Sequence, residues 1–127
     1  MQTEPRAAQE AFQDILLRMN AAGGFQASLV ASRDGLPIVT VPSHYDLEVA
    51  AAMGALLASV ADESQARVGL ESMDEVVVLG RDRKRLILRH FKVGEEVLVL
   101  AAIVPPLVPY RRHTNRAIRE IEEFLTT

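Results

Sequence analysis

A long and almost uniformly apolar segment, Asp46 to Val68, constrains the fold of this chain more than any other feature. It reads D-L-E-V-A-A-A-M-G-A-L-L-A-S-V-A-D-E-S-Q-A-R-V, contains no proline, and consists mostly of good helix formers. Its first turns are apolar nearly all round. A helix of this kind must be covered on more than one side. We therefore expect a helix that has two separate contact surfaces.

The two surfaces can be read from the helical spacing of the side chains. One stripe, which the domain itself can cover, consists of Val49, Met53, Leu56 and Val60. The other is small at every fourth position, at Ala50, Gly54 and Ala58, so a second backbone can approach closely. This spacing is best known from membrane helices, but the segment carries four acidic residues and is too rich in alanine for a membrane span. The second stripe is therefore interpreted as a protein contact surface.

Length and composition favour one domain over residues 1–127 with an ample apolar core. The formal charge of -3, from 14 basic and 17 acidic side chains, gives no reason to expect a nucleic-acid partner. The absence of cysteine excludes disulfides, thiolate metal sites and thiol nucleophiles. The sequence has neither a signal-peptide pattern nor an apolar run of about 18 residues. We expect a cytoplasmic protein without a membrane span.

Two further helices and five strands are predicted around the long helix. Near the start, a helical face is formed by Ala8, Phe12, Ile15, Leu16 and Met19, with a stop at Asn20 to Gly24. The final helix, Tyr110 to Leu125, has an apolar face of Ala117, Ile118, Ile121, Phe124 and Leu125. The strands are expected at 25–32, 36–41, 71–80, 85–91 and 97–104.

The connections between these strands predict how they are paired. Strands joined by short turns, such as the Asp-Gly turn at Asp34, must be antiparallel. The run Val97 to Val104 does not alternate with polar residues, which is typical of a central strand buried on both faces. Pro37 suggests an edge strand or the start of a strand. Together these features predict an antiparallel five-stranded sheet with helices on both sides.

The order of elements, with G-F-Q-A-S-L-V-A-S-R-D-G-L-P-I at Gly24 to Ile38, resembles the Roadblock/dynein light-chain family. The match extends through the Asp46 helix and the strand E-V-V-V-L-G, and Gly35-Leu36-Pro37 is its most specific part. The extra final helix and the alanine-rich style resemble the prokaryotic branch, which includes MglB-like regulators of Ras-like GTPases.

The resemblance implies a profilin-like α/β (α+β) sandwich of order α-β-β-α-β-β-β-α. Its five-stranded antiparallel sheet would carry the long central helix on one face and the terminal helices on the other. Members of the family dimerise by pairing the third strand with its mate and placing the two long helices side by side. The implied dimer interface here comprises Ala50, Gly54, Leu57, Ala58, Ala61, Met73, Glu75, Val77 and Leu79.

The function implied by the resemblance is a non-enzymatic homodimeric regulator or scaffold that binds a Ras-like small GTPase. Some members accelerate GTP hydrolysis by reshaping the active site of the GTPase. The expected partners are a second copy of the chain, with a higher oligomer left open, and the GTPase. The chain has no G-x-x-x-x-G-K-[ST] motif, so it is not itself a P-loop GTPase. His44, His90 and His113 lack metal-ligand spacing. No catalytic residue, cofactor or metal is expected.

Two basic features are candidate partner-binding sites. A predicted hairpin turn contains Arg81, Arg83, Lys84 and Arg85 around Asp82. They are either a soluble tip that discourages edge pairing or a contact for an acidic partner or anionic membrane. The second feature is on the final helix, where Arg112 and Arg116 share a face with Arg119. Positive charge at a helix start opposes the macrodipole and hints at a partner, whereas Glu120 and Glu123 favour a solvated face.

Two other classes of function remain open. The chain could be an interaction module, such as a light chain of a larger assembly, that binds without nucleotide dependence. A small-molecule sensor ranks lower, because the aliphatic strands offer few polar groups to orient a ligand. An enzyme ranks lowest.

Overall fold

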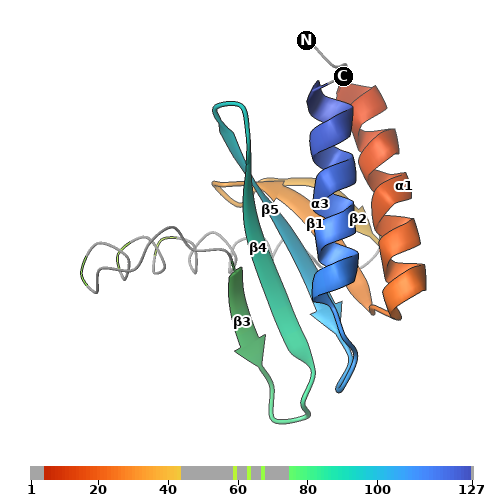
Figure 1. Cartoon of the computed structure of the whole chain (residues 1–127), viewed down its shortest axis with the longest axis vertical. Coiled ribbons are helices and arrows are strands. Elements are labelled where there is room, and N and C mark those ends of the chain that lie inside the picture. The colour runs from red at the N-terminus through yellow and green to blue at the C-terminus, as the bar shows by residue number, and fades with distance from the viewer. Residues whose placement is uncertain (1–4, 44–58, 60–62, 64–66, 68–74, 127) are drawn as a thin grey trace.

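The computed structural model describes residues 5–43, 59, 63, 67 and 75–126. Within these residues the chain forms two helices and five strands (Figure 1). The helices are α1 (Pro5–Gly23) and α3 (Arg111–Thr126). The strands are β1 (Ala27–Ser32), β2 (Pro37–Val41), β3 (Glu75–Leu79), β4 (Arg85–Val93) and β5 (Glu96–Val104). The predicted Asp46–Val68 helix lies almost entirely outside the described residues.

The five strands form one sheet in the order β2-β1-β5-β4-β3, and every neighbouring pair is antiparallel. The prediction of a five-stranded antiparallel sheet is confirmed. As expected, β5 lies in the centre, and Leu98 to Ala102 along it are all buried. The strand that begins with Pro37 lies at one edge, where its missing N–H costs no ladder bond.

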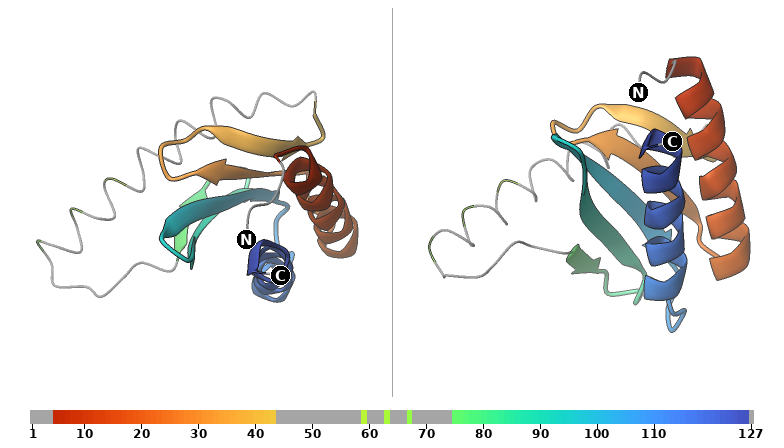
Figure 2. Two further views of the ribbon diagram at one scale, coloured as in Figure 1. Left: turned by 90° about the horizontal axis from the view of Figure 1, so that it is seen from above. Right: turned by 45° about the horizontal axis from the view of Figure 1, so that its top comes forward.

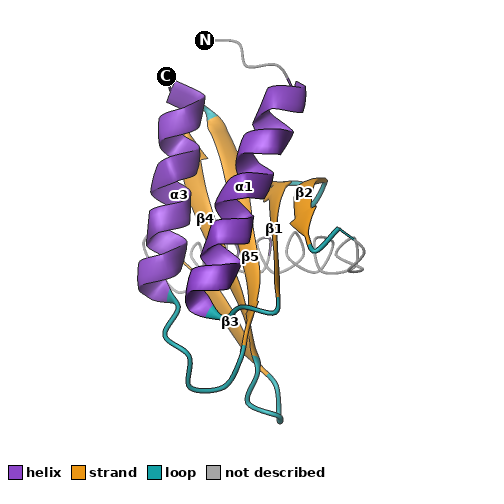
Figure 3. Ribbon diagram, turned by 90° about the vertical axis from the view of Figure 1, so that its right-hand side faces the viewer, coloured by secondary structure: helices purple, strands orange, loops and turns teal. Residues whose placement is uncertain are grey.

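The two helices lie side by side on one face of the sheet, as two views show (Figures 2 and 3). They run antiparallel, since the start of α1 lies beside the end of α3: Phe12 meets Phe124 edge to face at 6.0 Å between ring centroids. The predicted apolar faces of both helices are confirmed. The core between helices and sheet includes Leu16, Ile87, Leu100, Val104 and Ile121, each at most 1% exposed.

A second apolar cluster lies on the opposite face of the sheet. It consists of Leu29, Ala31, Leu88, Val99 and Ala101, which alternate along their strands with residues of the first core. The sheet therefore buries both of its faces. The stripe predicted to cover this second face, Val49, Met53, Leu56 and Val60, lies outside the described residues.

Two predicted boundaries are wrong by a few residues. Helix α1 continues through Asn20 to Gly23, because Asn20 turns its side chain to the carbonyl of Val41 and leaves the helix intact. Only Gly24, at a φ of 70°, ends it. The hairpin after β4 is tighter than the predicted turn Val93 to Glu96. Since Gly94 has a φ of 61°, Gly94 and Glu95 alone make the turn, and β4 extends to Val93.

Candidate functional site

The open edge of the sheet at β3 is the first candidate for a binding surface. Strand β3 pairs with β4 on one side, from Glu75↔Arg89 to Leu79↔Arg85, and is the outer strand on the other. Its residues Val77, Val78 and Leu79 are 43%, 39% and 52% exposed. A strand edge offers unpaired N–H and C=O groups, which is a template for pairing with another strand. Among the strands that the structure describes, this edge therefore combines backbone groups without a strand partner with exposed apolar side chains.

The structure places part of the predicted dimer interface on this edge. Glu75, Val77 and Leu79 alternate along β3, so they share one face of the strand. The other predicted interface residues, Ala50, Gly54, Leu57, Ala58, Ala61 and Met73, lie outside the described residues. The interface as a whole stays a prediction.

The first residue of β3 takes part in a polar network that the sequence did not reveal. The carboxylate of Glu75 accepts a hydrogen bond from the Tyr110 hydroxyl at 2.7 Å and forms an ion pair with Nη1 of Arg111 at 2.9 Å. Nε of the buried Arg89 lies 3.9 Å from the same carboxylate. Arg111, at the unfavourable positive end of α3, thus has a carboxylate partner within the chain.

The network surrounds the guanidinium of Arg89, a buried positive charge that needs hydrogen-bond and charge partners. It is only 6% exposed, and its Nη1 donates to Oγ1 of Thr114 at 2.9 Å and to Oδ1 of Asn115. A buried charge is tolerated only when it is paired and hydrogen-bonded. The first turn of α3 therefore supplies oxygens to Arg89, while β3 supplies the negative charge. The detectable signal in the sequence was an arginine at an inward position of an apolar strand.

The network also changes the acidity of Tyr110. Burial, followed by the hydrogen bond to Glu75 and the charge of that carboxylate, raises the pKa of the Tyr110 hydroxyl above its ordinary value of about 10. Arg111 and Arg85 act in the opposite direction and are outweighed. Tyr110 therefore stays a hydrogen-bond donor throughout the physiological range.

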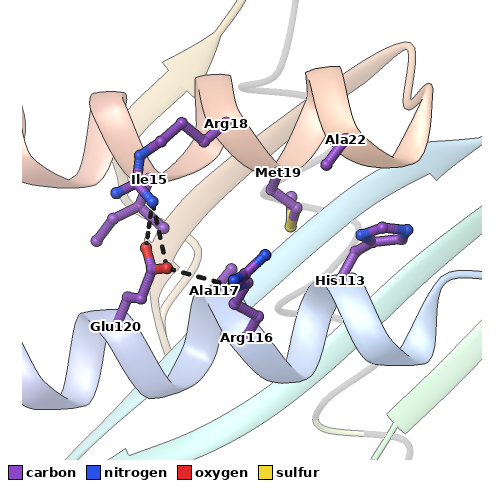
Figure 4. Close-up of a pocket in the computed structure, with 8 residues that line it drawn as sticks. All are labelled: Ile15, Arg18, Met19, Ala22, His113, Arg116, Ala117 and Glu120. Carbon is purple, nitrogen blue, oxygen red and sulfur yellow. Dashed lines mark hydrogen bonds and ion pairs between the residues drawn. The ribbon is translucent and has the colours of Figure 1, made fainter.

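A groove between α1 and α3 holds the second predicted basic feature (Figure 4). A hollow of about 320 Å³ is lined by Ile15, Arg18, Met19, Ala22, His113, Arg116, Ala117 and Glu120. A neighbouring hollow shares three of these residues and adds Arg112 and Arg119. The floor is apolar and the rim is rich in guanidinium groups, so an anion would be attracted here.

One carboxylate, Glu120, crosses this groove. It lies 2.9 Å from Nη1 of Arg18 and 3.9 Å from Nε of Arg116, so it joins α1 to α3. The hydrogen bond to Asp14, followed by the charge of Glu120, raises the pKa of Arg18 further above its ordinary range. Arg112 lines the groove beside Ala22, near the negative end of the α1 dipole, which offsets its poor position at the start of α3.

The third basic group lies at the turn between β3 and β4. Arg81, Arg83 and Lys84 are exposed there, and Oδ1 of Asp82 accepts a hydrogen bond from the Lys84 backbone at 3.1 Å. The fourth basic residue of the sequence run, Arg85, belongs to β4 and turns its guanidinium toward the loop after β5. The predicted partner contacts thus divide between this turn and the α1–α3 groove, and their role stays a prediction.

Two kinds of feature, a cluster of metal-ligating side chains and a membrane-spanning helix, were sought in the part of the chain that the structure describes. No group of three or more His, Asp or Glu side chains is placed to hold a metal ion among these residues. No helix within the same residues is both long and apolar enough to cross a membrane.

Comparison with solved structures identifies the architecture. MglB of Myxococcus xanthus superposes with a TM-score of 0.80 at 14% identity, covering 99% of this chain and 94% of that one. A structure described as MglB with tetrameric arrangement gives 0.76 at 18% identity, with 97% and 91% covered. A Roadblock/LC7 domain from Streptomyces avermitilis gives 0.74 at 16% identity, with 91% and 98% covered.

The chain has the Roadblock/LC7 fold. A more distant likeness, with a TM-score of 0.58 at 11% identity, is to the profilin in a LokiProfilin1–rabbit actin complex, covering 91% of this chain and 94% of that one. The predicted profilin-like α+β class is therefore confirmed.

Sequence comparison adds relatives without an assigned role. An uncharacterised protein of Methanocaldococcus jannaschii is 29% identical over 87 residues, which cover 68% of this chain and 71% of that protein. The sequence matches no known protein-family model. The similarity of this chain to proteins of known structure is thus clearer in the backbone structure than in the amino-acid sequence.

Proposed function

We propose that this protein is a non-enzymatic homodimeric regulator that binds a Ras-like small GTPase. The observation that carries the proposal is the open β3 edge, with exposed Val77, Val78 and Leu79, in a chain whose fold is that of MglB. Pairing of β3 with β3 of a second copy extends the sheet across two molecules and removes those apolar side chains from water. The tetrameric arrangement described for one MglB supports self-association in this fold.

The proposed homodimer is tested by analytical sedimentation of the protein at micromolar concentration. Val77→Lys places a charge on the β3 edge and is expected to convert the dimer to a monomer. Leu17→Lys is the matched control, since Leu17 is a 49% exposed leucine on α1, away from the sheet edge. A second variant, Gly54→Leu, tests the predicted contact of the long helices. A monomeric wild-type protein would contradict the dimer.

The proposed binding to a GTPase is tested with a Ras-like small GTPase, chosen from the neighbouring genes if one is encoded there. Complex formation is measured by calorimetry with the GTPase loaded with GDP or with a non-hydrolysable GTP analogue, and GTP turnover is measured separately. Binding that depends on the nucleotide is expected. Absence of a complex would contradict the regulator function, whereas an unchanged turnover would restrict the function to binding.

A light chain or scaffold of a larger assembly is the second candidate. It is favoured by the same β3 edge, because an edge strand can pair with a different Roadblock subunit as well as with its own copy. Binding to such a subunit with equal affinity in the presence of GDP and of GTP would favour this candidate over the regulator.

A further inference from the structure

A strained turn follows the central strand β5. The amide of Val108 donates to the carbonyl of Pro105 at 3.4 Å, which closes a four-residue turn. Pro106 occupies its second position and Leu107 its third, where Leu107 has a φ of 66°. A turn with proline second and a positive φ third is of type II, which normally places glycine or asparagine at the third position. Leucine is disfavoured at this position.

Leu107 is almost fully exposed, so packing of its side chain against the described part of the chain cannot offset this strain. Its side chain is 98% exposed, the highest value among the large apolar side chains that the structure describes. Glycine would remove both the strained backbone and the exposed apolar surface. The strained backbone at Leu107 is the observation that suggests a functional role for this residue.

The turn is held rigidly in place by Arg85. Nη2 of Arg85 donates to the carbonyl of Pro105 at 2.8 Å and to that of Val108 at 2.6 Å, which are the two ends of the turn. The guanidinium of Arg85 lies over the ring of Tyr110, 5.5 Å from its centroid. Because the backbone around Leu107 is already fixed, little conformational entropy is lost when a partner takes up the side chain.

The surroundings of Leu107 indicate the chemistry of the partner. Arg85 pairs with Val104 on one side and with Leu79 on the other, so the turn after β5 and the β3–β4 turn lie at the same end of the sheet (Figures 1 and 3). The β3–β4 turn exposes three basic side chains and one aspartate, Asp82, which is engaged with its own turn. A complementary surface has an apolar pocket bordered by carboxylates.

We propose that Leu107 is the anchor through which this protein docks on its GTPase partner, inserting into an apolar pocket that carboxylates border on the side of Arg81, Arg83 and Lys84. This inference rests on the proposed function and adds the surface that makes the contact. A protein surface fits better than a lipid bilayer, because one leucine on a rigid turn buries too little apolar area to hold a membrane.

The test is calorimetric titration of a Ras-like small GTPase with wild-type protein, Leu107→Gly and Leu107→Asn. Both substitutions suit a positive φ, so both variants are expected to unfold at the same or a higher urea concentration than wild type. Both are expected to bind the GTPase at least about tenfold more weakly, as for an anchor residue. Leu36→Asn is the control, since Leu36 is also an exposed leucine, at 68%, in a different turn; its affinity is expected to be unchanged.

The proposed contact between the basic turn and carboxylates of the partner is tested with a triple variant, Arg81→Gln, Arg83→Asn and Lys84→Gln. Asparagine is chosen at position 83 because it suits the φ of 72° there. The triple variant is expected to associate more slowly and to lose the salt dependence of binding. If Leu107→Gly binds the GTPase as tightly as wild type, Leu107 is not the anchor. If the triple variant keeps the salt dependence of wild type, carboxylates do not border the pocket of the partner. A wild-type protein that does not bind the GTPase would overturn the proposed function and, with it, this inference.

Sedimentation with vesicles of phosphatidylcholine and phosphatidylglycerol tests whether Leu107 docks on a lipid surface instead of the GTPase. Wild-type protein is expected to stay in the supernatant. Co-sedimentation that is lost in Leu107→Gly, together with unchanged GTPase binding, would assign the anchor to a lipid surface and overturn the proposal. The sedimentation mass of the dimer is expected to be the same for all Leu107 variants, which keeps this surface distinct from the β3 edge.

Discussion

The hydroxyl of Tyr110 donates a hydrogen bond of 2.7 Å to Oε1 of Glu75, which joins the loop before α3 to the outer strand of the sheet. The same carboxylate forms an ion pair with Arg111 at 2.9 Å and lies 3.9 Å from the buried Arg89. One carboxylate thus connects β3, β4 and the start of α3. An edge strand of five residues is held to the domain by this group as well as by its ladder with β4.

Replacing this carboxylate should destabilise the domain. Glu75→Gln removes a negative charge beside the buried Arg89 and one ion pair of Arg111, so we expect a loss of about 1–3 kcal/mol in the free energy of unfolding. The measurement is urea denaturation at neutral pH. Glu95→Gln, at the exposed turn after β4, is the matched control and is expected to change stability by less than about 0.5 kcal/mol. Equal stability of the two variants would show that the network contributes nothing.

The raised pKa of Tyr110 predicts a dependence of stability on alkaline pH. A phenol whose pKa is higher in the folded state holds its proton more tightly there than in the unfolded chain. Its contribution is therefore complete below about pH 10 and is lost as the pH rises through the folded-state pKa. The chain has two tyrosines and no tryptophan. In a Tyr45→Phe variant, phenolate absorbance then reports Tyr110 alone, and we expect its midpoint above that measured in urea. A lower midpoint in the folded protein would contradict the network.

Substitutions at the two glycines at the end of α1 should destabilise the domain for different reasons. Gly24 has a φ of 70° and open space around a Cβ, so Gly24→Ala is expected to cost about 1–2 kcal/mol, with part recovered in Gly24→Asn. A Cβ at Gly23 would lie 2.6 Å from Cε1 of Phe25, a core ring that also contacts His113. Gly23→Ala therefore forces the ring to move, and asparagine recovers nothing there. Thermal unfolding of Gly24→Ala, Gly24→Asn, Gly23→Ala and Gly23→Asn tests whether asparagine recovers stability at position 24 and not at position 23.

The centre of β5 should be the most sensitive part of the sheet. Leu100 is 0% exposed and lies in the core between sheet and helices, so Leu100→Ala is expected to lose about 2–5 kcal/mol. Leu17→Ala makes the same chemical change on the exposed side of α1 and is expected to cost less than about 1 kcal/mol. If both variants unfold at the same urea concentration, the assignment of this core is wrong.

Elements with a clear hydrophobic period could be predicted from the sequence alone. The buried faces of α1 and α3 follow the spacing of Phe12, Leu16 and Ile121, because helical burial is a local pattern that short spacings encode. The central position of β5 followed from its unbroken apolar run, since only a strand covered on both faces tolerates it. The edge position of the strand that begins with Pro37 followed from the missing N–H.

Contacts between distant segments could not be predicted in the same way. The pairing of Glu75 with Tyr110 and Arg111 depends on how β3 and the loop before α3 meet in space, which no local spacing encodes. The exposure of Leu107 could not be predicted either, because the neighbouring Pro105, Pro106 and Pro109 indicate only a break in regular structure. Arg85 was read as one more charge of the hairpin turn, and only the fold shows that it holds the turn at Pro105.

The position of β5 between β1 and β4 determines the order in which the domain can be assembled during synthesis. Hairpin β1–β2 is local in the chain, and so is the meander from β3 to β5, but the contact that joins them pairs Ala27 with Ile103. During synthesis, the β5-facing edge of the first hairpin can therefore be covered only after β5, which ends at Val104, has left the ribosome. Until then β1 is an unpaired edge of the nascent chain, which is a template for pairing with strands of other molecules.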